Sequence, residues 1–126
     1  MDYNFGISQE VKLQDLLIEK FGALKKTPTQ YDLFDFEGDN LLVELKSRRC
    51  NHDTYPDTMI GYNKIEYAIN NPDKKVIFCF NFKDGLYYHT FKPDYDYTPK
   101  IAGRCDRGRP EFKKHSFIKI KDLILL

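Results

Sequence analysis

Long apolar runs are missing from this sequence. No run approaches the roughly 20 residues that a helix needs to cross a bilayer. The start, Met1-Asp2-Tyr3-Asn4, also lacks the basic and then apolar character of a signal peptide. We therefore expect no membrane partner and an intracellular location, in the cytoplasm or nucleoid.

Cysteine is scarce, and its spacing excludes a common zinc motif. The three cysteines, Cys50, Cys79 and Cys105, are an odd number and lie too far apart for CxxC pairs. Cys79 lies in an apolar run, where burial is expected. Cys50 and Cys105 lie in polar stretches, so a metal or redox role is the alternative there, but the sequence favours an ordinary structural role for all three.

A large net charge is also absent, because Lys plus Arg number 20 and Asp plus Glu number 19, which gives +1. This balance does not exclude a nucleic-acid partner, since affinity for phosphate depends on where positive charge clusters. Two clusters are present, and each could bind phosphate or be a solvated surface. They are Lys46-Ser47-Arg48-Arg49, and the group Arg104, Arg107, Arg109, Lys113 and Lys114.

What is present is the composition of an ordinary globular chain, 41% hydrophobic and 31% charged, without repeats or low-complexity segments. A chain of 126 residues is long enough for one compact domain and too short for two ordinary ones. We therefore expect a single domain over residues 1–126.

Hydrophobic spacing predicts a mixed order of helices and strands. A helix is expected over residues 8–21, with Ser8 as N-cap and Gly22 as its end. The further expected elements are strands at 31–36 and 41–46 joined in a hairpin, a helix from Asp57 or Thr58 to Asn71, strands at 75–82, 86–91 and 115–120, a loop at 92–110, and a tail at 121–126 that packs on the core. This order predicts one mixed α/β or α+β domain.

The predicted hairpin gathers charged side chains at its open end. Side chains alternate across a sheet, so Glu44 and Lys46 share a face. A loop with an odd number of residues, such as three with Gly38 in the left-handed conformation, places Asp32 opposite Glu44. A two-residue loop places them on opposite faces, and a shift of register exchanges Asp32 with Asp35.

Two acids beside a lysine at the end of an apolar strand are an oxygen-ligand site for a hard divalent cation such as Mg²⁺. Burying such charges without partners is costly, so their placement after Leu41-Leu42-Val43 indicates a function. The alternative is a surface hairpin with a cross-strand ion pair between Asp32 and Lys46, worth under ~1 kcal/mol.

The run Val43-Glu44-Leu45-Lys46-Ser47-Arg48, after a helix carrying Glu10 and a strand carrying Asp32, resembles the PD-(D/E)XK nuclease superfamily. Within it, the short spacing is most similar to small archaeal and viral Holliday-junction resolvases and phage endonucleases. The resemblance covers roughly residues 7–91. Tyr31 stands where the motif has proline before the aspartate, and residues 92–110 have no counterpart.

The resemblance implies a restriction-endonuclease-like fold, with a central mixed β-sheet flanked by helices. It also implies a metal-dependent deoxyribonuclease that hydrolyses phosphodiester bonds, with branched or junction DNA as a candidate substrate in DNA recombination and a homodimer as a candidate assembly. A viral source would place it in the host cell. Asp32, Glu44 and the Leu45 carbonyl would hold Mg²⁺ or Mn²⁺, Lys46 would orient or deprotonate the attacking water, and Glu10 would complete the site, with Glu19 as the alternative.

Nucleic-acid contacts are expected from residues around the motif and from the second basic cluster: Arg48, Arg49, Lys64, Arg104, Arg107 and Arg109. Lys64 is expected either to reach a phosphate or the active site, or to be a solvated helix lysine. His52 is a weaker candidate, and Tyr55, Tyr62, Tyr95 and Tyr97 could stack on unpaired bases or simply pack. The alternative functions are an RNA- or single-strand-directed nuclease and a non-catalytic nucleic-acid-binding protein.

Overall fold

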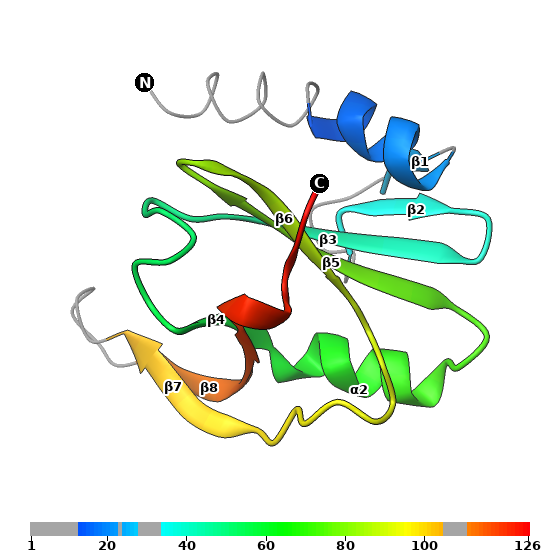
Figure 1. Cartoon of the computed structure of the whole chain (residues 1–126). Helices are drawn as coiled ribbons and strands as arrows, with labels where there is room; N and C mark the ends of the chain where they lie inside the picture. Colours follow the sequence, from blue (N-terminus) through cyan, green and yellow to red (C-terminus); the bar gives the residue numbers. More distant parts are fainter. Residues whose placement is uncertain (1–12, 23, 28–33, 105–110) are drawn as a thin grey trace.

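The computed structural model describes residues 13–22, 24–27, 34–104 and 111–126 (Figure 1). Its main sheet has six strands in the order β1-β2-β3-β5-β6-β9. Their bounds are β1 Leu24–Lys26, β2 Phe36–Gly38, β3 Leu41–Ser47, β5 Lys75–Phe82, β6 Gly85–Thr90 and β9 Ile124–Leu125. β3 and β5 are parallel and the other neighbours antiparallel. The sheet is therefore mixed, as the sequence predicted.

Helices cover both faces of this sheet, and they explain why its central strands are apolar on both sides. Residues 13–21 form a helix, here called the N-terminal helix, on one face. The helix α2, Tyr62–Asn70, covers the other face in the crossover from β3 to β5 (Figure 1). Parallel neighbours need such a crossover, because a tight turn cannot join them.

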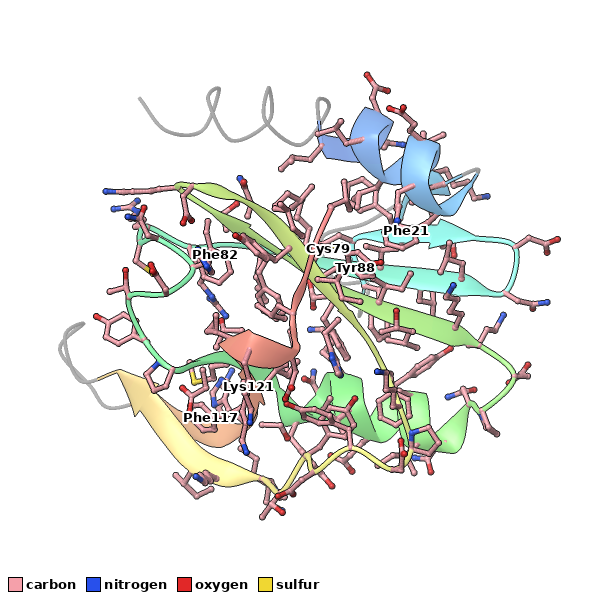
Figure 2. All side chains as sticks on the ribbon, in the orientation of Figure 1. Phe21, Cys79, Phe82, Tyr88, Phe117 and Lys121 are labelled. Atoms are coloured by element: carbon pink, nitrogen blue, oxygen red, sulfur yellow. The ribbon has the colours of Figure 1, made fainter. Side chains whose placement is uncertain are left out.

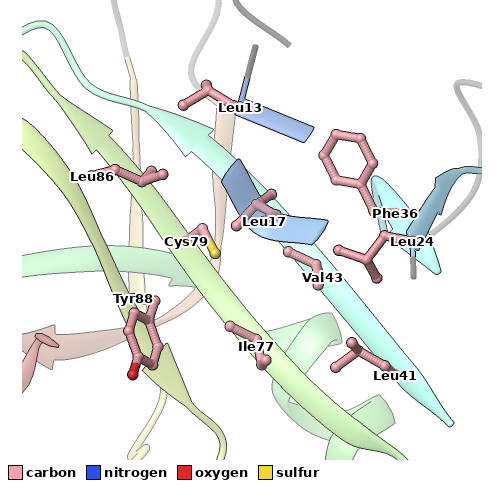
Figure 3. Close-up of a cluster of buried hydrophobic side chains, with 10 residues drawn as sticks. All are labelled: Leu13, Leu17, Leu24, Phe36, Leu41, Val43, Ile77, Cys79, Leu86 and Tyr88. Carbon is pink, nitrogen blue, oxygen red and sulfur yellow. The ribbon is translucent and has the colours of Figure 1, made fainter. Parts of the chain in front are cut away.

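Two apolar clusters follow from the alternation of side chains along β3 and β5. Under the N-terminal helix, Leu17 packs in one cluster with Val43 and Ile77, and all three are fully buried (Figure 3). At the end of this helix, Phe21 packs edge to face on Tyr88 of β6, with ring centroids 5.1 Å apart (Figure 2). The alternate residues of β5 point to the α2 side. The opposite faces of one strand thus belong to different clusters.

A second sheet of three antiparallel strands lies beside α2, in the order β4-β8-β7. The strands are β4 Asp57–Gly61, β7 Lys100–Arg104 and β8 Glu111–Lys119, and a short 3-10 helix, Ile120–Asp122, follows β8. Ile60 of β4 and Ile118 of β8 are buried in the same cluster as Ile65 of α2 and Phe78 of β5. The second sheet is therefore joined to the main sheet by an apolar core on the α2 side.

The end of the N-terminal helix agrees with the sequence prediction. Gly22 has φ +99, a conformation that side chains disfavour, and its N–H donates to the Ile18 carbonyl at 2.9 Å. Ser8, the predicted N-cap, lies outside the described residues. At the other end of the chain, Leu126 packs on the cluster under this helix, as predicted for the tail.

Two predictions of local structure were wrong. Residues 57–61 were expected to begin a helix, but they form β4, because pairing with β8 satisfies their backbone and buries Ile60. Residues 92–110 were expected to be a loop, yet they contain β7, which pairs with β8. Both errors concern strands that pair with β8, which is distant in the sequence from β4 and directly follows β7. None of the helices in the described residues is long and apolar enough to span a membrane.

The hairpin turn also differs from the expectation. Gly38 pairs with Leu41, so the turn has two central residues, Asp39 and Asn40, and not three. Asn40 takes the left-handed conformation with φ 55, and Gly38 does not. The strand before the turn is described as Phe36–Gly38, which lies later in the chain than the predicted 31–36.

The buried contact between the two sheets can be tested with Ile118→Ala. Ile118 is fully buried, so this change should lower the free energy of unfolding by about 2 to 5 kcal/mol. Urea denaturation followed by circular dichroism measures it. Ile101→Ala is the matched control, because Ile101 on β7 is 65% exposed and should cost under about 1 kcal/mol. Equal losses in both variants would contradict the proposed core.

Candidate active site

Three hydrogen bonds hold Asp35 in place beside β3, two between backbone groups and one from a backbone N–H to its carboxylate. The N–H of Asp35 donates to the Val43 carbonyl, and its carbonyl accepts from the N–H of Thr27, both at 3.0 Å. The N–H of Leu45 donates to Oδ2 of Asp35 at 2.8 Å. The main chain thereby fixes the Asp35 carboxylate beside β3, next to Glu44.

Glu44 lies on the face of β3 that α2 covers, and it is buried, with 4% of its surface exposed. Burial is the largest cause that raises its pKa from 4.5 to about 7. The Asp35 carboxyl raises this pKa further, through a hydrogen bond and through repulsion of the ionised form, and Lys64 partly lowers it. Near neutral pH, Glu44 is therefore poised between its protonated and ionised forms.

Lys64 brings a positive charge to Glu44 from the first turn of α2. Its Nζ lies 2.9 Å from Oε2 of Glu44, and only 16% of the lysine side chain is exposed. Within the described part of the chain, however, Oε2 of Glu44 is buried and accepts no hydrogen bond of acceptable geometry. The Lys64 ammonium is thus close to Oε2 of Glu44 but poorly aligned for a hydrogen bond. We interpret the contact as an electrostatic pair.

A cleft of about 510 Å³ lies at this end of β3. It is lined by Lys46, Arg48, Met59, Gly61, Tyr62, Asn63, Lys64, Glu66, Lys113, Lys114 and His115. Lys64 both lines the cleft and contacts Glu44, so only this side chain separates the buried acid from the wall of the cleft at this point. Basic side chains predominate around it, which favours an anionic ligand.

The residues present fit a divalent cation. A buried carboxylate oxygen of Glu44 has the Lys64 ammonium nearby but no hydrogen bond of acceptable geometry, and a second carboxylate, that of Asp35, lies beside it and raises its pKa. Hard cations such as Mg²⁺ take oxygen ligands of this kind. A bound cation would replace the repulsion between the two acids by attraction to a shared charge.

The structure places some predicted site residues together and leaves others undescribed. Glu44, Lys46 and Lys64 meet at the cleft or beside it. The residues outside the description are Glu10, Asp32, Arg107 and Arg109, and the side chain of Arg104 on β7 is likewise not described. The alternative acid Glu19 is exposed on the N-terminal helix, which covers the opposite face of the sheet from Glu44.

The two-residue turn bears on the choice between Asp32 and Asp35. It is the case in which we expected Asp32 and Glu44 on opposite faces, and the argument for Asp32 required an odd loop. Asp35 is the acid whose carboxylate the structure places beside Glu44. The sequence had offered Asp35 only as the result of a register shift. The turn residue Asn40, which favours left-handed φ, was the signal available for a shorter turn.

Arg48 and Arg49, which were predicted to contact nucleic acid, lie in different surroundings. Arg48 lines the cleft, and it also donates to the carbonyl of Met59 and to Oγ1 of Thr58, so it ties the end of β3 to β4. Its guanidinium lies 5.8 Å from the Phe80 ring centroid. Arg49 is exposed. Arg48 thus has a structural role beside any contact with phosphate.

His52 and Tyr97 have other partners. His52 stacks on Tyr87 with ring centroids 4.7 Å apart. The backbone N–H of His52 donates to Oδ1 of Asp84 at 2.8 Å. Together with Asp53, these groups bring possible ligand atoms within 4.8 Å of one another at the surface. Tyr97 is buried and lies 2.7 Å from the ring of His89, so it packs in the core and does not face a base.

Comparison with protein families identifies a family that this chain matches. Residues 8–122 match the model of a family described as "Phage putative PDDEXK endonuclease". The match includes β3, α2 and the whole second sheet, so it extends well beyond residue 91, where the resemblance seen in the sequence ended. No curated protein and no solved structure matches the chain.

The raised pKa of Glu44 predicts that the free energy of unfolding of the metal-free protein depends on pH. The folded state binds this proton up to about pH 7 and the unfolded state only up to about 4.5, so stability falls as pH rises between these values. Glu44→Gln, which mimics the protonated acid, should therefore gain stability relative to the wild type from pH 5 to pH 8, by up to about 3 kcal/mol. Urea denaturation in EDTA at each pH measures the difference.

Glu66→Gln is the control for that measurement, because Glu66 is exposed and lines the same cleft. The stability difference between Glu66→Gln and the wild type should vary with pH much less than that of Glu44→Gln, because the Glu66 side chain is exposed and not buried. A difference between Glu44→Gln and the wild type that stays constant from pH 5 to pH 8 would contradict the proposed burial of the charge.

Proposed function

Because the chain belongs to the phage PDDEXK endonuclease family, it is a nuclease, and we propose that it hydrolyses phosphodiester bonds in DNA with Mg²⁺ or Mn²⁺. We assign the cation to the carboxylates of Asp35 and Glu44 and the backbone carbonyl of Leu45. The observation that supports this assignment most is the buried Oε2 of Glu44, which has only a poorly aligned contact with Lys64 and lies beside a second carboxylate.

The bound cation would lower the pKa of a water molecule and neutralise charge that develops on the phosphate. Asp35 and Glu44 hold it at the end of β3. Lys46, two residues after Glu44 and half-buried in the wall of the cleft, orients the attacking water or takes its proton. Among the described residues Lys46 has no ion-pair partner, so its ammonium group can orient the water, and its neutral amine form can take the proton of the water.

Lys64 acts at the same centre from α2. Its Nζ contacts Glu44 and its side chain also lines the cleft, so Lys64 could contact the phosphate if a cation were bound at Glu44. Asp32 and Glu10, outside the described residues, are further candidate ligands of the same cation. We also propose that Arg48, Arg49, Arg104, Arg107 and Arg109 contact the nucleic-acid backbone.

We further propose that residues 1–126 form a single nuclease domain and that branched DNA is its substrate. Cutting a junction on two strands needs two active sites, which a homodimer would supply. The other candidates are a nuclease directed to RNA or single strands, and a binding protein without catalysis. The family match and the complete Asp35, Glu44 and Lys46 set favour catalysis.

A cleavage assay with Lys46→Ala tests the catalytic proposal. Supercoiled, linear, single-stranded and four-way-junction DNA, and RNA, are offered side by side over a range of Mg²⁺ and Mn²⁺ concentrations. The wild type should cut the junction fastest. The variant should lose about 10² to 10⁴ in rate, because a water-activating group is gone, while it still binds the substrate. Full activity of the variant would refute the role of Lys46.

Asp35→Asn and Asp32→Asn form a matched pair that decides between the two acids. Asp35→Asn should lose Mn²⁺ binding in a calorimetric titration and lose cleavage, as Glu44→Gln does, because each removes a charged ligand. Asp32→Asn should retain more of both than Asp35→Asn. If only Asp32→Asn loses the cation, the assignment to Asp35 is wrong.

A further inference from the structure

The wall of the cleft formed by β8 has no part in the chemistry described above. Lys113 and Lys114 of β8 are exposed and line the cleft, and His115 follows them. The backbone of Gly61, where β4 ends, and the first residues of α2 line it as well. These groups come from segments that are about 50 residues apart in the chain.

The strand register explains why they meet. β4 and β8 are antiparallel, and Gly61, the last residue of β4, pairs with His115. α2 begins at the next residue, Tyr62, so the basic end of β8 lies next to the first turn of α2 (Figure 1). The second sheet thus carries Lys113 and Lys114 to the helix terminus.

This helix terminus is suited to an anion. Its N-cap is Gly61, which offers no capping side chain, and its first turn contains no acidic residue. The first N–H groups of a helix lack intrahelical acceptors and carry a partial positive charge. The N–H of Lys64 bonds to the Asn63 side chain at 3.0 Å, and no comparable side-chain bond is described for the N–H of Tyr62 or Asn63.

The charge around the cleft points the same way. Five of its lining residues are cationic, namely Lys46, Arg48, Lys64, Lys113 and Lys114, and one, Glu66, is anionic. Lys64 is already matched by Glu44 and Arg48 by its own partners, so Lys113 and Lys114 are the cations that the reaction centre does not use. A volume of about 510 Å³ falls in the range of roughly 300 to 1,000 Å³ typical of small-ligand pockets, which gives room for a nucleotide unit.

We propose that Lys113, Lys114 and the first turn of α2 form a subsite for a backbone phosphate of the nucleic-acid substrate, next to the phosphate that is cleaved. This inference rests on the proposed function, since Lys46 and Lys64 of the proposed reaction centre line the same cleft. The ligand is a phosphodiester within a strand and not a free phosphate. The second sheet therefore contributes residues that bind the substrate, whereas the main sheet contributes residues that take part in the reaction.

Binding of a fluorescein-labelled DNA oligonucleotide, measured by anisotropy in EDTA from 50 to 300 mM NaCl, tests the subsite without cleavage. Each phosphate contact contributes about 0.9 to the slope of log affinity against log salt for duplex DNA and about 0.7 for single strands. Lys113→Ala/Lys114→Ala should therefore reduce the slope by roughly 1 to 2 and weaken binding at 50 mM salt by at least about tenfold.

The matched control is Lys74→Ala/Lys75→Ala, which removes two adjacent lysines and the same charge. Lys75 pairs with Leu41 at the start of β3, so both lysines lie at the end of the sheet opposite to Lys46. The control should keep the wild-type slope. Equal slopes in the two double variants overturn the subsite, and Lys113→Gln/Lys114→Gln repeats the test if the alanine variant does not fold.

Amide resonances of the first turn of α2 give a second readout. Addition of unlabelled oligonucleotide should shift the Tyr62, Asn63 and Lys64 amide signals in the wild type and shift them much less in Lys113→Ala/Lys114→Ala. Unshifted signals in the wild type overturn the subsite. Shifts that inorganic phosphate produces and the oligonucleotide does not also overturn it, because they would show a site for the free ion.

Hydrolysis of bis(4-nitrophenyl) phosphate by the wild type with Mn²⁺ separates this inference from the proposed function. No hydrolysis of this small diester or of any nucleic acid refutes the nuclease proposal, and a reduced salt slope in Lys113→Ala/Lys114→Ala would still support the subsite. Hydrolysis together with an unchanged slope refutes the subsite alone.

Discussion

The burial of Glu44 between Asp35 and Lys64 is the interaction on which the rest of the site depends. A carboxylate with 4% exposure is costly to ionise, and the neighbouring Asp35 adds to that cost. Lys64 offsets only part of it, through a contact at 2.9 Å that lacks good hydrogen-bond geometry. The arrangement of these three side chains therefore lowers the stability of the metal-free protein. A binding site for a cation is expected to carry such a cost.

The fold places this buried acid at the end of one strand and opens a basic cleft beside it. β3 and β5 are parallel, so the chain between them must cross over, and α2 covers the face to which Glu44 points. The crossover starts with β4, which pairs with β8 of the second sheet, and α2 follows β4. The reaction centre and the basic wall of the cleft therefore arise from the same connection.

Much of the fold could be predicted from local patterns. The apolar runs of β3 and β5, the end of the N-terminal helix at Gly22 and the packing of Leu126 on the core all agree with the sequence. Residues 57–61 could not be predicted, because Met59 and Ile60 fit the helical spacing of the following segment. Their pairing with β8, more than 50 residues later in the chain, overrides that local preference.

The sequence by itself determined the mixed α/β class and the strand that carries Glu44 and Lys46 on one face, since side chains alternate along any strand. Only the tertiary structure decided which other residues join them. The length of the turn at Asp39 and Asn40 brought Asp35 beside Glu44, because a shift of one residue in register exchanges the faces of a strand. The crossover brought Lys64 to Glu44, and no local pattern records a contact between residues on separate elements.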